Sequence, residues 1–133
     1  MTICGVEIKS NYMVLSVVNK NDTETDYQEL KIKKLILEND EDRESIVTLK
    51  EAFEDFINKN KIEKIVIKKR SKKGNFAGGA ITFKIETIIQ LNSICNVEFV
   101  TSQALSKFEK KNEIIYPKGL NKYQEQSYLC CLI

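Results

Sequence analysis

The chain has 133 residues, of which 42% are hydrophobic and 30% are charged, and its formal net charge is +2. This composition is typical of globular proteins and excludes a disordered or membrane-spanning class, and the length predicts a single domain over residues 1–133. There is no apolar run long enough to cross a membrane and no secretory signal at the N-terminus, so we expect a cytoplasmic protein without a membrane partner.

The sequence contains no histidine. Histidine is the commonest general base at neutral pH and the commonest zinc ligand, so its absence excludes Ser-His and Cys-His catalysis. Any metal site would need carboxylates or thiolates. The four cysteines, Cys4, Cys95, Cys130 and Cys131, form no C-x-x-C motif, and we expect reduced thiols. For the adjacent Cys130 and Cys131, packing of a terminal helix is favoured over a redox or metal-binding role.

The N-terminal third of the chain shows the pattern of a three-stranded antiparallel meander. Two apolar runs, at 2–8 and 12–18, are separated by the polar residues 9–11, which favours a tight hairpin. A turn signal at 19–22 precedes a third run, 27–37, in which apolar residues alternate with lysines. Ile36 breaks this alternation, so we expect a bulge or a change of packing near the end of the third strand.

The rest of the chain alternates predicted helices and strands. Acidic residues at 38–44 precede a helix, with Asp40 or Asp42 as its N-cap, and a short β-branched run at 62–67 predicts a buried strand parallel to the first. A second helix is expected from about Ala77, a fifth strand at 97–100, a third helix from 101–103 and a terminal helix at about 120–132. The predicted inward positions of the helices are Ile46, Leu49, Phe53, Phe56 and Ile57, then Ile81, Ile85, Ile88 and Ile89, then Ala104, Leu105 and Phe108, and finally Tyr128, Leu129 and Leu132.

A dense basic run follows the predicted strand at 62–67. Five of the six residues at 68–73 are cationic, and α/β proteins usually place binding groups where a strand ends and a loop begins. We therefore predict a surface for an acidic partner, either nucleic acid or a protein, while a solvated lysine-rich face is the plain alternative. The predicted ligand-binding residues are Lys68, Lys69, Arg70, Lys72, Lys73 and Asn75.

The order of the predicted elements is β-β-β-α-β-α-β-α with a further terminal helix, which is the succession of the ribonuclease H-like fold. We therefore expect an α/β fold with a five-stranded mixed sheet of order 3-2-1-4-5, flanked by helices on both faces.

A narrower similarity lies in residues 4–7, in 67–70 together with 73–80, and in 83–91. These segments resemble a small bacterial family labelled only as a domain of unknown function, whose members are similar to Holliday-junction resolvases. The resemblance covers nearly the whole chain. It implies the fold and brings no established activity with it.

This resemblance implies where a nuclease site would lie. Resolvases place carboxylates at the end of strand one, at the end of strand four and on the terminal helix, where they hold two metal ions. At the matching positions stand Glu7, Lys68 and Gln126, with Glu125 beside the last. A lysine repels a divalent cation, so we predict no metal site, no cofactor and an ion pair between Glu7 and Lys68.

Three functions remain open at this point. The favoured one is a non-catalytic binding protein, a pseudoenzyme that engages an acidic partner through the basic run, with an inhibitor or immunity protein as one version. The alternative is a structure-specific nuclease that uses Mg²⁺ with the catalytic candidates Glu7 and Glu125, completed by Glu86 or by a partner chain. The third is a subunit that forms a homodimer through an exposed sheet edge or helix face.

Overall fold

The computed structural model describes residues 1–70 and 79–133. Within these residues, six strands form one mixed sheet with the order β3-β2-β1-β5-β6, and β4 pairs with β2. The strands are β1 (Thr2–Lys9), β2 (Tyr12–Lys20), β3 (Thr25–Gln28), β4 (Lys34–Ile36), β5 (Lys64–Lys68) and β6 (Asn96–Val100). The helices are α1 (Arg43–Lys59), α2 (Ala80–Gln90), α3 (Ser102–Lys111) and α4 (Glu125–Leu132), the last preceded by the 3-10 turn η1 (Lys122–Gln124).

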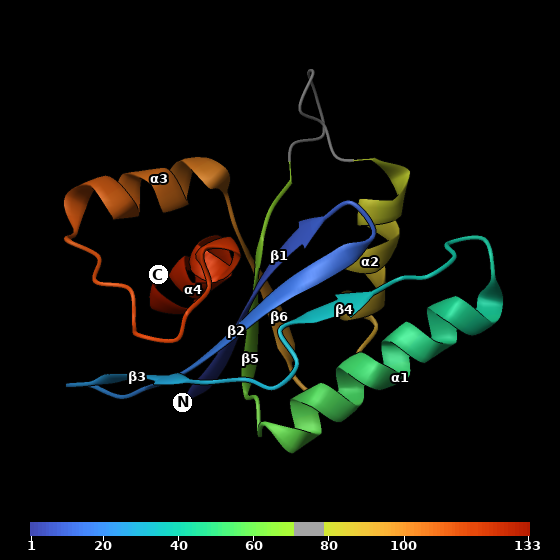
Figure 1. Ribbon diagram of the computed structural model, residues 1–133, viewed down its shortest axis with the longest axis horizontal. Coiled ribbons are helices and arrows are strands. Elements are labelled where there is room, and N and C mark those ends of the chain that lie inside the picture. Colours follow the sequence, from blue (N-terminus) through green and yellow to red (C-terminus); the bar gives the residue numbers. More distant parts are fainter. Residues whose placement is uncertain (71–78) are drawn as a thin grey trace.

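The sheet lies between two pairs of helices. Figure 1 shows α1 and α2 on one side of it and α3 and α4 on the other. Strand β1 is antiparallel to β2 and parallel to β5, and β5 is parallel to β6. This arrangement confirms the predicted ribonuclease H-like fold.

The predicted count of five strands is wrong, because the third strand is divided into β3 and β4. Both pair antiparallel with β2: Val17 lies opposite Gln28, and Val14 lies opposite Lys34. Five residues, 29–33, therefore lie across from only two residues of β2, and the extra length lets Leu30 turn into the core, where it is buried. The expected irregularity of this strand exists, but it lies before Lys34 and not at Ile36.

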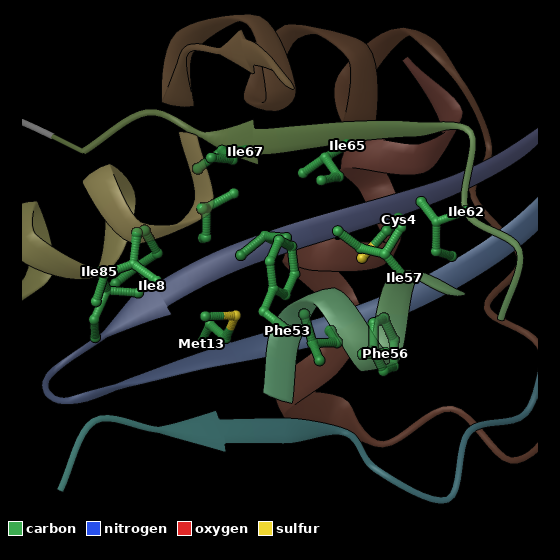
Figure 2. Close-up of a cluster of buried hydrophobic side chains, with 14 of the residues drawn as sticks. Cys4, Ile8, Met13, Phe53, Phe56, Ile57, Ile62, Ile65, Ile67 and Ile85 are labelled. Carbon is green, nitrogen blue, oxygen red and sulfur yellow. The ribbon is translucent and has the colours of Figure 1, made fainter. Parts of the chain in front are cut away.

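The larger core cluster lies between the sheet and helices α1 and α2 (Figure 2). Asp42 is the N-cap of helix α1, and its side chain accepts a hydrogen bond from Ser45 N, so of the two predicted caps Asp42 is confirmed. Its inward stripe is confirmed at four of the five predicted positions: Leu49, Phe53, Phe56 and Ile57 are buried. Helix α2 begins at Ala80, and its predicted start near Ala77 lies outside the described residues.

Helix α4 packs directly on the other face of the sheet. A Cβ atom added at Gly5 of β1 would lie 1.8 Å from the backbone oxygen of Ser127, so only glycine permits this approach. Buried polar contacts hold the helix in register: the Ser16 and Ser127 hydroxyls are 2.6 Å apart, and Gln124 Nε2 donates to Leu15 O at 3.0 Å. The start of α4 is thereby placed over β1 and β2.

None of the helices within residues 1–70 and 79–133 combines the length and the apolar character that a membrane span requires.

Candidate functional site at the strand ends

Three side chains from distant parts of the chain meet where β1 and β5 end. The ammonium of Lys68 donates to Glu7 Oε2 at 3.4 Å and to Gln126 Oε1 at 2.9 Å. Glu7 comes from β1, Lys68 from β5 and Gln126 from the first turn of α4. We call these three residues the strand-end cluster. The predicted ion pair between Glu7 and Lys68 is confirmed, and Gln126 completes it.

The cluster is partly shielded from water, and a second cation lies beside it. Glu7 is 8% exposed, and the side chain of Lys68 is 23% exposed. The other carboxylate oxygen of Glu7, Oε1, lies 3.7 Å from the ammonium of Lys9. One carboxylate is therefore flanked by two ammonium groups.

This arrangement opposes metal binding. In the part of the chain that the structure describes, no three acidic, cysteine or histidine side chains are grouped so that they could hold a metal ion. An ammonium occupies the space beside Glu7, and it would repel a divalent cation brought to that carboxylate. The Lys68 ammonium therefore stands where the resemblance to resolvases implies a carboxylate.

Glu125, the second catalytic candidate, precedes Gln126 in the first turn of α4. Among the described residues, it makes no hydrogen bond or ion pair with the strand-end cluster. Burial and the hydrogen bond that its hydroxyl donates to Glu109 raise the pKa of Tyr116 to about 12, and the charge of Glu125 contributes to this shift. Glu125 is thus a minor contributor to the raised pKa of Tyr116, and it forms no hydrogen bond with Glu7 among the described residues.

Arg70 of the basic run makes its contacts within the protein, with residues of helix α2. It forms an ion pair with Glu86 of α2, Nη1 donates to Thr82 Oγ1 at 2.8 Å, and the guanidinium carbon lies 3.9 Å from the centre of the Phe83 ring. These contacts connect the end of β5 to α2. Glu86, which could complete a nuclease site, is therefore paired with Arg70 and not with the strand-end cluster.

Lys69 is the exposed cation between these two engaged side chains. Its backbone N donates to Val100 O at 2.7 Å, which continues the pairing of β5 with β6. The side chain lines a small open cavity of about 240 Å³ at the carboxyl ends of β5 and β6. The remaining lining residues are Arg70, Thr101, Ser102 and Gln103. Three further predicted ligand-binding residues, Lys72, Lys73 and Asn75, lie outside the described residues.

Residues 1–132 match the sequence model of a family described as a protein of unknown function (DUF3010). The chain belongs to this family. No curated protein matches it.

Solved resolvase structures share the fold of this DUF3010 protein. A Fowlpox virus resolvase in complex with Holliday junction DNA is 16% identical with a TM-score of 0.57, and the match covers 99% of this chain and 95% of that one. RuvC of T. thermophilus in complex with a Holliday junction substrate is 8% identical with a TM-score of 0.58, and the match covers 98% of this chain and 90% of that one. The predicted resemblance to resolvases is therefore confirmed for the fold.

Sequence reasoning missed one part of the site in this DUF3010 protein. The Lys34 ammonium lies over two aromatic rings, 5.0 Å from the centre of Tyr12 and 4.3 Å from the centre of Tyr123. Strand alternation would have placed Lys34 and Ile36 on one face of the sheet. Nothing in the sequence pattern would have placed Tyr123, which comes from η1, beside them.

The cysteines serve as packing residues in this DUF3010 protein. Cys4, Cys130 and Cys131 are buried, and burial raises the pKa of each thiol, in the case of Cys130 to about 12. The Cys131 thiol donates a weak hydrogen bond to Ser16 O at 3.5 Å. This supports the interpretation of Cys130 and Cys131 as residues that pack the terminal helix.

We expect the folded protein to resist thiol reagents. A thiol with a pKa of about 12 is only about 10⁻⁴ thiolate at pH 8, and burial also blocks access. DTNB at pH 8 is therefore expected to label no more than Cys95 within minutes, and all four cysteines in guanidinium. Cys95→Ser should abolish the fast labelling. Rapid reaction of two or more thiols in the folded protein would contradict this assignment.

Proposed function

We propose that this protein is a non-catalytic nucleic-acid-binding protein that uses a resolvase-like fold as a scaffold. The observation that carries the proposal is the Lys68 ammonium, held between Glu7 and Gln126. The resemblance to resolvases implies metal-binding carboxylates at these places. A fixed cation there attracts a phosphate directly, without a metal ion between them.

The charges around the cluster support a phosphate backbone as the ligand. Lys9 lies beside Glu7, and exposed Lys69 lies at the next position after Lys68. Lys9 and Lys68 thus place two ammonium groups beside one carboxylate, and Lys69 adds a third cation at the same end of β5. Contacts of this kind supply most of the affinity of sequence-independent nucleic-acid binding. Two structurally similar proteins are described in complex with Holliday junctions, and we take the class of ligand from them as part of this proposal.

The nuclease alternative is less well supported. The two-metal Mg²⁺ chemistry that the resemblance to resolvases implies would need several carboxylates gathered around the ions. Glu125 makes no hydrogen bond with Glu7 among the described residues, Glu86 is paired with Arg70, and Lys68 lies beside Glu7. An acidic protein remains the other class of partner that a cationic surface would fit.

Binding to DNA is expected to depend steeply on salt. The wild-type protein should bind a duplex and a four-way junction at low ionic strength, and the logarithm of its affinity should fall linearly with the logarithm of salt concentration. Lys69→Glu should weaken binding by about tenfold, because it replaces a phosphate-contacting cation with an anion. Fluorescence anisotropy over a salt series measures both effects.

Lys61→Glu provides the matched control for Lys69→Glu. Lys61 is also exposed, but it precedes β5 and so lies at the opposite end of that strand. Lys61→Glu should keep DNA affinity within about twofold of the wild-type value, since exposed charges more than about 10 Å apart are screened at 0.1 M salt. Absence of DNA binding at low salt would overturn the proposal and favour an acidic protein partner. Mg²⁺-dependent cleavage that is lost in Glu7→Gln would favour the nuclease.

A further inference from the structure

The strand-end cluster belongs to a longer row of side chains that crosses the sheet. Glu7 of β1 lies opposite Val14 of β2, and Val14 lies opposite Lys34 of β4. Lys68 of β5 lies on the other side of Glu7 and is paired with it. Residues opposite one another on neighbouring strands point to the same face, so Lys68, Glu7 and Lys34 share the α4 face of the sheet.

A second row on the same face combines a cation with apolar groups. Lys9 of β1 lies opposite Tyr12 of β2, and Tyr12 lies opposite Ile36 of β4. Ile36 is 48% exposed, and Tyr123, the middle residue of η1, is 36% exposed. The α3 and α4 pair therefore leaves this corner of the sheet open to solvent.

The two tyrosines at this corner are already arranged around a cation. The Lys34 ammonium lies within 6 Å of both ring centres, the distance at which a cation is attracted to the face of an aromatic ring. Lys34 itself is exposed. The ring faces are thus held next to a positive charge that a flat, electron-rich group can replace.

We propose that Tyr12 and Tyr123 form a stacking site for an unpaired base, and that Lys9, Lys34 and Lys68 hold the phosphates of the same single strand. This inference rests on the proposed function and makes single-stranded nucleic acid its preferred ligand. Aromatic rings next to lysines are the usual elements of single-strand binding sites.

The size of the row fits a polynucleotide. Lys68 and Lys34 lie on β5 and β4, three strand spacings apart, which is about 14 Å at 4.8 Å per spacing. Successive phosphates of one DNA strand are about 3.4 Å apart along the helix axis. The two lysines can therefore contact different phosphates of one strand while a base lies on the rings between them.

The position of Lys34 also accounts for a preference for unpaired bases. A base that stacks on Tyr12 or Tyr123 displaces the ammonium, which is then released toward the phosphate backbone. A base inside a duplex is already stacked on its neighbours and cannot reach the rings. Duplex DNA would therefore contact the lysines through its phosphates but would not stack on the rings.

The test compares a single strand with a blunt duplex of the same length. A single strand carrying 2-aminopurine reports stacking because its fluorescence is quenched when it lies on an aromatic ring. The wild-type protein should bind the single strand more tightly than the duplex and should quench the fluorescence of its 2-aminopurine. Tyr123→Ala should weaken single-strand binding by about tenfold and abolish the quenching, while duplex affinity changes by less than about twofold. Tyr123→Phe keeps the ring face and should keep the quenching.

Phe99→Ala is the matched control. Phe99 is 40% exposed, and it lies opposite Ile67 of β5, which belongs to the core on the α1 and α2 face. Its loss should change neither affinity nor quenching. Duplex binding without quenching of the single strand, or an equal loss of both affinities in Tyr123→Ala, would overturn this inference and leave the proposed function standing. Absence of binding to either DNA would overturn both.

Discussion

The double variant Lys68→Glu with Gln126→Glu is expected to turn the strand-end cluster into a metal-binding site. Both side chains contact one another beside Glu7 in the folded protein, so the variant gathers three carboxylates where one carboxylate, one ammonium and one amide now lie. Without metal, repulsion between the partly buried carboxylates should lower the free energy of unfolding by about 3 kcal/mol or more. Mn²⁺ at 100 times its dissociation constant should restore about 2.7 kcal/mol.

Thermal unfolding with and without Mn²⁺ measures this change. The wild-type midpoint should not respond to Mn²⁺, because the Lys68 ammonium repels the ion. Lys69→Glu is the control with the same reversal of charge one residue further along; Lys69 is exposed, so its stability should change by less than about 0.5 kcal/mol and should stay independent of Mn²⁺. A wild-type protein stabilised by Mn²⁺ as strongly as the double variant would contradict our account of Lys68.

Gly5→Ala, which adds a single methyl group to the sheet, is expected to destabilise the protein strongly. Its Cβ would lie 1.8 Å from Ser127 O and 2.9 Å from Ser127 C, and both are backbone atoms that cannot rotate away. Helix α4 would have to move off β1, which would break the buried contact between the Ser16 and Ser127 hydroxyls. We expect a loss of about 3 kcal/mol or more, the upper range for overpacking. Denaturant unfolding measures it.

Gly79→Ala is the control for the added methyl group. A Cβ atom there would meet nothing within 4 Å, and Gly79 has an ordinary φ of −70° as the N-cap of α2. Its cost should stay below about 1 kcal/mol, the usual effect of replacing a favourable N-cap residue by alanine. If Gly5→Ala were no more costly than Gly79→Ala, the close approach of α4 to β1 would not contribute to stability.

The basic run illustrates how far the sequence predicts the site. Its position at the end of a strand follows from local pattern, and β5 does end at Lys68. The three consecutive cations at 68–70 nevertheless meet different surroundings: Lys68 pairs with Glu7, Lys69 is exposed, and Arg70 pairs with Glu86. Charge density alone cannot distinguish them, because each partner is supplied by another element of the fold.

The third strand shows a second limit of sequence patterns. The alternation at 27–37 predicts a strand, and both ends of that segment do pair with β2. Alternation does not reveal that residues 29–33 leave the regular ladder, because that depends on burying Leu30 against the core.

By itself, the sequence determined the kinds and order of the elements apart from the division of the third strand, the inward faces of the helices and, through the absence of histidine, which chemistries are excluded. These properties depend on periodicity, capping and side-chain type, which are local. Only the tertiary structure decided that Lys68 contacts Gln126, 58 residues away, and that Tyr123 lies beside Lys34. Such contacts depend on how α4 is packed across β1, and that packing is set by the fit of Gly5 against Ser127 and by the buried hydrogen bonds around it.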